Sequence, residues 1–153
     1  MPLEIRRDEL TGGAVRSLVA AHLDQMHAQT PPESVHALGI AALTDPSITV
    51  WSAWLRDDLA GIGALKRLDG RRGEIKSMRV APAHLGTGVG RALLRHIVAA
   101  GRESGMTSVW LETGAGDEFL AARGLYLSEG FTPCEPFGDY APDPLSAFFT
   151  RPL

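Results

Sequence analysis

The chain has 153 residues, of which 44% are hydrophobic and 22% are charged, an ordinary composition for one soluble globular domain spanning residues 1–153. The formal net charge of −3 lacks the basic excess of a nucleic-acid-binding protein, and no apolar run reaches the roughly 18 residues that cross a membrane, so we expect neither partner. The single cysteine, Cys134, cannot form an internal disulfide, and no Cys/His cluster has zinc-ligand spacing, so we predict a cytoplasmic protein without a metal site.

The first third of the chain predicts one strand followed by two helices. Residues 3–7 form a short strand, and apolar residues recur three and four positions apart over residues 12–28, which predicts an amphipathic helix. The sequence Thr-Pro-Pro at residues 30–32 ends that helix. Because proline is tolerated in a first helical turn and Glu33 favours the positive end of a helix, we predict a second, short helix over residues 33–43.

Strands dominate the middle of the chain. Two apolar runs, residues 48–55 and 59–68, are joined by Arg-Asp-Asp, which predicts a hairpin with a short turn. Residues 74–80 form the next strand. By the two-residue period of a strand, we expect Glu74, Lys76, Met78 and Val80 to share one of its faces.

Helices and strands alternate in the remainder. The predicted helices cover residues 89–103 and 118–129, and the predicted strands cover residues 108–113, 131–133 and 146–151. This order of elements predicts an α+β fold in which helices flank a mixed sheet.

A glycine-rich loop lies between the strand at 74–80 and the helix at 89–103. Gly86, Gly88 and Gly90 allow close approach of a ligand, and the helix N-terminus offers free N–H donors, so an anion is the natural guest; a glycine-rich turn without a ligand fits equally well. A dinucleotide motif fails because Arg91 and Leu93 stand where it needs glycine, and a P-loop fails because no Gly-Lys-Ser/Thr occurs. What remains is a loop that holds a pyrophosphate by backbone amides, supplemented by Arg91.

Two longer segments make this interpretation specific. Residues 74–94 read EIKSMRVAPAHLGTGVGRALL, and residues 124–131 read GLYLSEGF. The first resembles the acetyl-CoA motif of the GCN5-related N-acetyltransferase (GNAT) family, and the second resembles that family's helix with a tyrosine just before a Gly-Phe strand entry. Both occur in the right order, and the resemblance extends over essentially the whole chain. The segment TPPESVH at residues 30–36 is similar to one found in small bacterial acetyltransferases.

The resemblance implies the acyl-CoA N-acyltransferase fold, a central, mostly antiparallel mixed sheet flanked by helices. It also implies acetyl-CoA (coenzyme A) as co-substrate and transfer of its acetyl group to a primary amine by direct attack in a ternary complex. The residues that it places on the coenzyme are Met78, Arg79, Val80, Leu85, Gly86, Thr87, Gly88, Val89, Gly90, Arg91, Thr113 and Tyr126. Leu85 departs from the Gln or Arg that the family pattern usually has, so a non-catalytic acyl-CoA-binding or sensing module stays open as an alternative.

The chemistry needs a neutral amine and a donor for the departing thiolate. Glu74 and Glu112 are both candidates for the general base, and each has the alternative of a solvated carboxylate at a strand end. Tyr126 matches the family tyrosine that points toward the coenzyme sulfur, so the resemblance makes it the candidate acid; on helix spacing alone it is a core tyrosine.

Polar groups for the acceptor concentrate in the first two predicted helices, a region that lines the acceptor pocket in the resembling family. From this region and from the loop at residues 137–144, which is long enough to cover the pocket, we take His27, Glu33, His36 and Tyr140 as candidate acceptor-binding residues. Structural histidines are the alternative for His27 and His36. We expect a small-molecule amine as the acceptor, and the sequence leaves a homodimer open.

Overall fold

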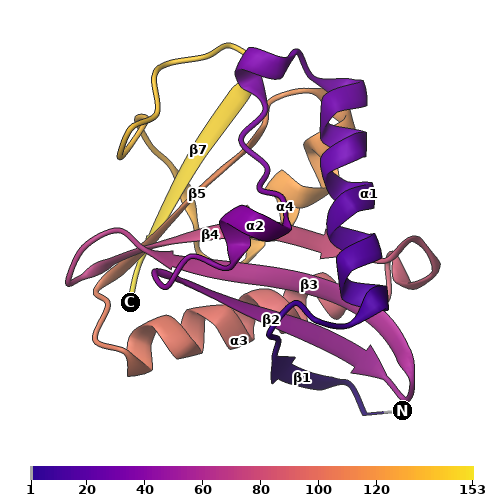
Figure 1. Ribbon diagram of the computed structural model, residues 1–153. Coiled ribbons are helices and arrows are strands. Elements are labelled where there is room, and N and C mark those ends of the chain that lie inside the picture. The colour runs from indigo at the N-terminus through magenta and orange to yellow at the C-terminus, as the bar shows by residue number, and fades with distance from the viewer. Residues whose placement is uncertain (1) are drawn as a thin grey trace.

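A computed structural model describes residues 2–153 and shows a seven-stranded mixed sheet with helices on both faces (Figure 1). The strand order is β1-β2-β3-β4-β5-β7-β6, and all neighbours are antiparallel except β4 and β5, which are parallel. The strands are β1 (Glu4–Arg7), β2 (Ile48–Leu55), β3 (Asp58–Arg67), β4 (Arg72–Val80), β5 (Ser108–Gly114), β6 (Thr132–Pro133) and β7 (Ser146–Pro152). The predicted fold class is confirmed.

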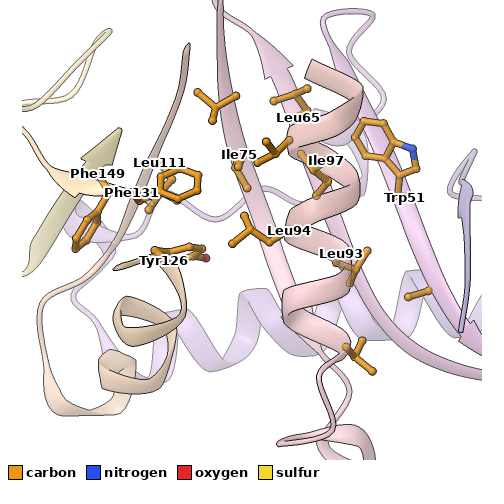
Figure 2. Packing of buried hydrophobic residues seen from close by; sticks show 14 of the residues in the cluster. Trp51, Leu65, Ile75, Leu93, Leu94, Ile97, Leu111, Tyr126, Phe131 and Phe149 are labelled. Carbon is orange, nitrogen blue, oxygen red and sulfur yellow. The ribbon is translucent and has the colours of Figure 1, made fainter. Parts of the chain in front are cut away.

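The helices are α1 (Gly13–Gln29), α2 (Ile40–Leu43), α3 (Val89–Glu103) and α4 (Leu120–Ser128), with short 3-10 turns η1 (Pro32–Ser34), η2 (Pro82–His84) and η3 (Asp117–Phe119). Two apolar clusters hold them to the sheet. One joins α3 and α4 to β3, β4, β5 and β7, as Figure 2 shows for Leu94, Ile75 and Tyr126. The other joins α1 and α2 to the opposite face through β2 and β3.

Glycine in β3 lets α3 lie close to the sheet. A Cβ added at Gly63 would stand 2.7 Å from Ile97 Cδ1 of α3 and 2.7 Å from Met78 Sδ of β4. Any larger residue would therefore push the helix away from the strand. The glycine that weakens β3 as an isolated strand is thus what allows the cluster between β3, β4 and α3 to close.

The predicted helix over residues 33–43 is wrong. The structure has η1 at its start and α2 at its end, and residues 35–39 between them are not helical. Gly39 is extended, with φ −81° and ψ 177°, and Ser34 donates a hydrogen bond to Asp143 Oδ2 at 2.5 Å. A contact between residues so far apart in the chain, together with an interior glycine, overrides the weak local preference for a helix.

The prediction that Glu74, Lys76, Met78 and Val80 share one face of β4 is also wrong. Ser77 has a φ of 55°, and the register against β3 shifts between Ile62 and Ala64, so β4 carries a β-bulge. Ile75 and Met78, three positions apart, both pack toward α3. Glu74 and Lys76 therefore lie on the α1 side of the sheet, whereas Met78 lies on the other side.

Candidate active site

The sheet splits where its two parallel strands diverge. The register between β4 and β5 runs from Arg72 opposite Ser108 to Ile75 opposite Leu111 and goes no further. A cavity of about 830 Å³ opens beyond that point, between α1, β4, β5, α4 and the loop at residues 85–91. The split leaves main-chain groups of β4 at a strand edge, where an extended ligand can pair with them.

The glycine loop forms one end of this cavity. Gly86 and Gly88 have φ values of 74° and 90°, in the left-handed region, and a Cβ at either position would have no atom within 4 Å. Gly88 is the N-cap of α3, and the first main-chain bond of the helix runs from Ala92 N to Gly88 O at 3.0 Å. The N–H groups of residues 89–91 precede that bond, so they are available to an anion.

Side chains contribute less to this end than the main chain does. The Arg91 guanidinium donates to Glu129 Oε2 at 2.7 Å and to Ser128 Oγ at 3.0 Å, which holds it at the end of α4. Arg95 shares the same carboxylate, with its Nε 2.6 Å from Glu129 Oε1. Leu85, which departs from the family pattern, is 66% exposed. An anion at the loop would thus depend mainly on backbone N–H groups. Of the predicted coenzyme residues, all but Thr87 and Val89 line the cavity.

Tyr126 of α4 is a core residue that also reaches the cavity. Its ring packs in the core, with centroids 5.8 Å from Phe131 and 6.4 Å from Phe149 (Figure 2), and it also lines the cavity. Burial, followed by the nearby charge of Glu112, raises the pKa of Tyr126 to about 12. The hydroxyl therefore stays protonated throughout the physiological range.

Glu112 of β5 lies half-buried in the cavity wall. Burial is the main cause that raises the pKa of its carboxyl above the usual range, and Glu74 adds to the shift. The hydroxyl of Ser146 and the charges of His36 and Lys76 oppose it. Glu112 forms no ion pair within residues 2–153. With its raised pKa, the carboxylate is a stronger base than a solvated glutamate and can accept a proton.

Glu74 of β4 is in a different state. It is only 4% exposed, which rules out a solvated carboxylate at a strand end. Lys76 Nζ donates to its Oε2 at 3.0 Å, and the hydroxyl of Tyr140 donates to the same oxygen. Lys76 Nζ also lies 2.9 Å from the Tyr140 hydroxyl. These contacts bind the loop before β7 to β4, which is a structural task for Glu74.

The acceptor candidates are only partly brought together. His36 lines the cavity, and Tyr140 stands behind it with the two ring centroids 4.8 Å apart. His27 and Glu33 are not among the described residues that line the cavity. Polar residues that the sequence did not single out as ligand-binding do line it, namely His22, Gln25, Lys76 and Ser77. Only the clustering of polar groups on the first helix gave a signal for His22 and Gln25.

Other parts of the molecule offer less chemistry. A second cavity, of about 540 Å³, is lined in part by Arg67 and Asp69, but Asp69 pairs with Arg72 at 2.6 Å and Arg67 donates to main-chain carbonyls. In the part of the chain that the structure describes, three or more His, Cys, Asp or Glu side chains nowhere gather as a metal site. Within that same part, no helix combines the length and apolar character needed to cross a membrane.

Comparisons with known proteins agree with this geometry. The model of the acetyltransferase (GNAT) family matches residues 15–131. The uncharacterized N-acetyltransferase YsnE of Bacillus subtilis is 52% identical over 151 residues, which cover 99% of this chain and 100% of that one. A Klebsiella pneumoniae structure described as an acyl-CoA N-acyltransferase has a TM-score of 0.80 at 26% identity and covers 99% of this chain and 97% of its own. A GNAT family acetyltransferase of Elizabethkingia anophelis, solved with acetyl-CoA bound, has a TM-score of 0.72 at 16% identity, covering 99% and 98% of the two chains.

Proposed function

Because the chain belongs to the acetyltransferase (GNAT) family, we propose that it transfers the acetyl group of acetyl-CoA to a primary amine of a small molecule, by direct attack in a ternary complex. One observation carries the proposal. Glu112, a half-buried carboxylate without an ion-pair partner in residues 2–153, and Tyr126, a buried phenol, line the same cavity as the glycine loop. A base, a hydrogen-bond donor and an anion site are thus combined in one cleft.

The coenzyme would be held by the main chain. The free N–H groups of residues 89–91 and the left-handed glycines at 86 and 88 fit the pyrophosphate. The diverging edge of β4 fits the extended pantetheine, with the N–H near Met78 serving the oxyanion and Val80 pairing with an amide. The exposed Leu85 interferes with none of these groups, since none of them is a side chain.

Glu112 is the base that we propose. An alkylammonium acceptor has a pKa of about 10.4, so a proton must leave its nitrogen before attack. Glu74 is already engaged by Lys76 and Tyr140, whereas burial makes Glu112 a stronger base than a solvated carboxylate. The ammonium first loses one proton to solvent. As the neutral nitrogen then bonds to the acetyl carbon and the bond from that carbon to sulfur breaks, a second proton passes from nitrogen to Glu112.

Tyr126 would assist the leaving sulfur by a hydrogen bond. Its pKa of about 12 keeps the hydroxyl protonated. Full transfer of that proton to a thiolate with a pKa of about 8.5 would cost about 5 kcal/mol. We therefore assign Tyr126 the role of a donor to the developing thiolate, which takes its proton from water after departure. This is a narrower role than general acid.

Direct attack is favoured over an acyl-enzyme because a thiol nucleophile is missing from the cleft. Cys134 is not one of the described cavity-lining residues, and burial raises the pKa of its thiol. A nucleophilic cysteine needs the opposite shift. The acceptor amine is then the only nucleophile that the proposal requires.

A small acceptor is favoured because contacts beside the cavity join segments that are far apart in the chain. Ser34 donates a hydrogen bond to Asp143, and His36 packs on Tyr140. These two contacts connect the segment after α1 to the loop before β7. The total cavity of about 830 Å³ lies within the range of small-molecule sites.

Two measurements test the function. Acetyl-CoA should raise the melting temperature of the wild-type protein. A panel of amines should then include some that release free coenzyme A thiol, at a rate that falls in the Glu112→Gln variant. Stabilisation by acetyl-CoA without thiol release on any amine would instead favour a binding or sensing module.

A further inference from the structure

Unpaired polar atoms gather on one wall of the cavity. Within residues 2–153, five buried side-chain atoms make no hydrogen bond of good geometry. One of them, Ser146 Oγ, is set apart from the rest because it lies close enough to the Glu112 carboxyl to lower the pKa of that group. The other four are His22 Nδ1 and Gln25 Oε1 of α1, with Ser77 Oγ and Arg79 Nε of β4, and all four residues line the cavity. We call these four residues the α1–β4 wall. Buried polar groups are normally paired, so such a cluster indicates a missing ligand.

Arg79 gives this wall its charge. Three lysine or arginine side chains line the cavity, and two of them are paired, Lys76 with Glu74 at 3.0 Å and Arg91 with Glu129 at 2.7 Å. Arg79 forms no ion pair within the described residues. Burial lowers the pKa of its guanidinium, and no neighbouring acid offsets this effect. The wall thus holds a cation that lacks its anion.

The other three residues of the α1–β4 wall are uncharged at pH 7. Burial, followed by the charge of Arg79, lowers the pKa of His22 to about 4, so its imidazole is neutral at pH 7. Ser77 adds a hydroxyl donor. It lies at the β-bulge of β4, where its φ is 55°. A guanidinium N–H beside a hydroxyl donor, both within a half-buried wall, is an arrangement that binds a carboxylate.

We propose that the acceptor carries a carboxylate as well as its amine, and that Arg79 and Ser77 of the α1–β4 wall bind this carboxylate. The inference rests on the proposed function. Arg79 on β4 and Glu112 on β5 present opposite charges to one cavity, so an amino-acid-like acceptor would be oriented with its ammonium toward Glu112. The pyrophosphate of the coenzyme is the other anion that could engage Arg79, and the experiment separates the two.

The test uses pairs of acceptors that differ by the carboxylate: phenylalanine and phenethylamine, lysine and cadaverine, glycine and methylamine. For at least one pair the wild type should show a kcat/KM about 10-fold or more higher for the amino acid. Arg79→Met should lower that value about 10- to 100-fold, mainly through KM, with little change for the matched amine. The Kd of acetyl-CoA should stay within about twofold. The control is Arg102→Met, at an exposed arginine near the end of α3.

Each result decides the inference. Equal losses for an amino acid and its matched amine would overturn it, and so would a rise in the Kd of acetyl-CoA of more than about tenfold, which would assign Arg79 to the pyrophosphate. Arg79→Gln replaces Arg79→Met if the latter does not fold. If no amine releases thiol, the proposed function fails. Calorimetric titration of the same pairs into the protein with coenzyme A then decides the inference: tighter binding of the acids that is lost in the variant supports it, and equal binding contradicts it.

Discussion

The two halves of the cavity are built in opposite ways. The coenzyme half, which consists of residues 85–91 and the first turn of α3, presents main-chain N–H groups, and its charged side chain, Arg91, is already paired with Glu129. The acceptor half consists of the α1–β4 wall and Glu112. Each wall residue presents a buried polar atom without a hydrogen-bond partner in the described chain, and Glu112 forms no ion pair there. Recognition by the main chain tolerates Leu85, whereas recognition by side chains depends on each residue.

The contrast has an energetic side. A buried polar group without a partner costs about 1–3 kcal/mol, so the acceptor half lowers the stability of the free protein and regains it when a ligand binds. The coenzyme half carries no such burden, because solvent reaches the loop around the exposed Leu85. Substitutions in the two halves should therefore differ in what they change, affinity for acetyl-CoA in one and turnover or pH-dependent stability in the other.

The largest effect is expected in the acceptor half. Replacing Glu112 by Gln removes the proposed base, so kcat should fall by about 10²- to 10⁴-fold while the Kd of acetyl-CoA changes little. Steady-state kinetics on an accepted amine, with calorimetry for acetyl-CoA, measures both. The acid side of the kcat/KM profile should also change, because the raised pKa of Glu112 sets the pH below which the base is protonated.

Glu74→Gln is the matched control for Glu112→Gln. The same change in charge at a residue that is engaged by Lys76 and Tyr140 should alter kcat by less than about tenfold. It should instead lower the free energy of unfolding by about 2 kcal/mol or more, because Lys76 loses its buried partner. A larger loss of kcat in Glu74→Gln than in Glu112→Gln would reverse the assignment of the base.

In the coenzyme half, affinity for acetyl-CoA should depend on the backbone conformation of the glycine loop. Gly88→Glu should weaken acetyl-CoA binding about 1,000-fold, because φ of 90° strains any residue with a Cβ and the carboxylate would occupy the anion site at the start of α3. Gly105→Glu is the control, since Gly105 has a φ of 88°, no atom within 4 Å of an added Cβ, and a position beyond the other end of α3. If both variants bind acetyl-CoA equally well, the loop is not the pyrophosphate site.

The same contrast explains what the sequence could predict. The glycine loop is contiguous, with a strand before it and a helix after it, so its position and its N–H donors could be inferred from spacing alone. The acceptor half brings together residues of α1, β4 and β5, which are far apart in the sequence. The bulge at Ser77 changes which face of the sheet the following side chains of β4 occupy, and residue propensities do not predict it. The two-residue period consequently put Glu74 and Met78 on one face, and the burial of Glu74 depends on Tyr140, a distant residue.

A third prediction concerns the neutral histidine of the acceptor half. The pKa of His22 is about 4 in the folded protein against 6.5 as reference, so between these values the unfolded chain binds the proton and the folded one does not. Stability is then lost as the pH falls from about 6.5 to 4, by about 3 kcal/mol. His22→Gln should abolish this part of the loss in urea titrations at pH 7 and pH 4.

His27→Gln serves as its control, because His27 is exposed on the same helix. This variant should keep the full acid sensitivity of the wild type. If His22→Gln is as acid-sensitive as the wild type, the pKa of His22 does not change on folding. The α1–β4 wall would then gain a second positive charge as the pH falls through about 6.5.

The smallest effect is expected where the two halves meet. Tyr126 follows Leu125, whose side chain faces Gly90 of the loop, and its own ring lies near Glu112. Tyr126→Phe keeps the packing on Phe131 and removes only the hydroxyl, so kcat should fall about 10- to 100-fold, as for one hydrogen bond to a charged group, with an unchanged Kd for acetyl-CoA. With a pKa of about 12, the tyrosine should add no alkaline limb to the wild-type kcat profile below about pH 11. A limb near pH 9 that vanishes in Tyr126→Phe would show that the tyrosine ionises far more easily than its burial implies, and would restore it to general acid.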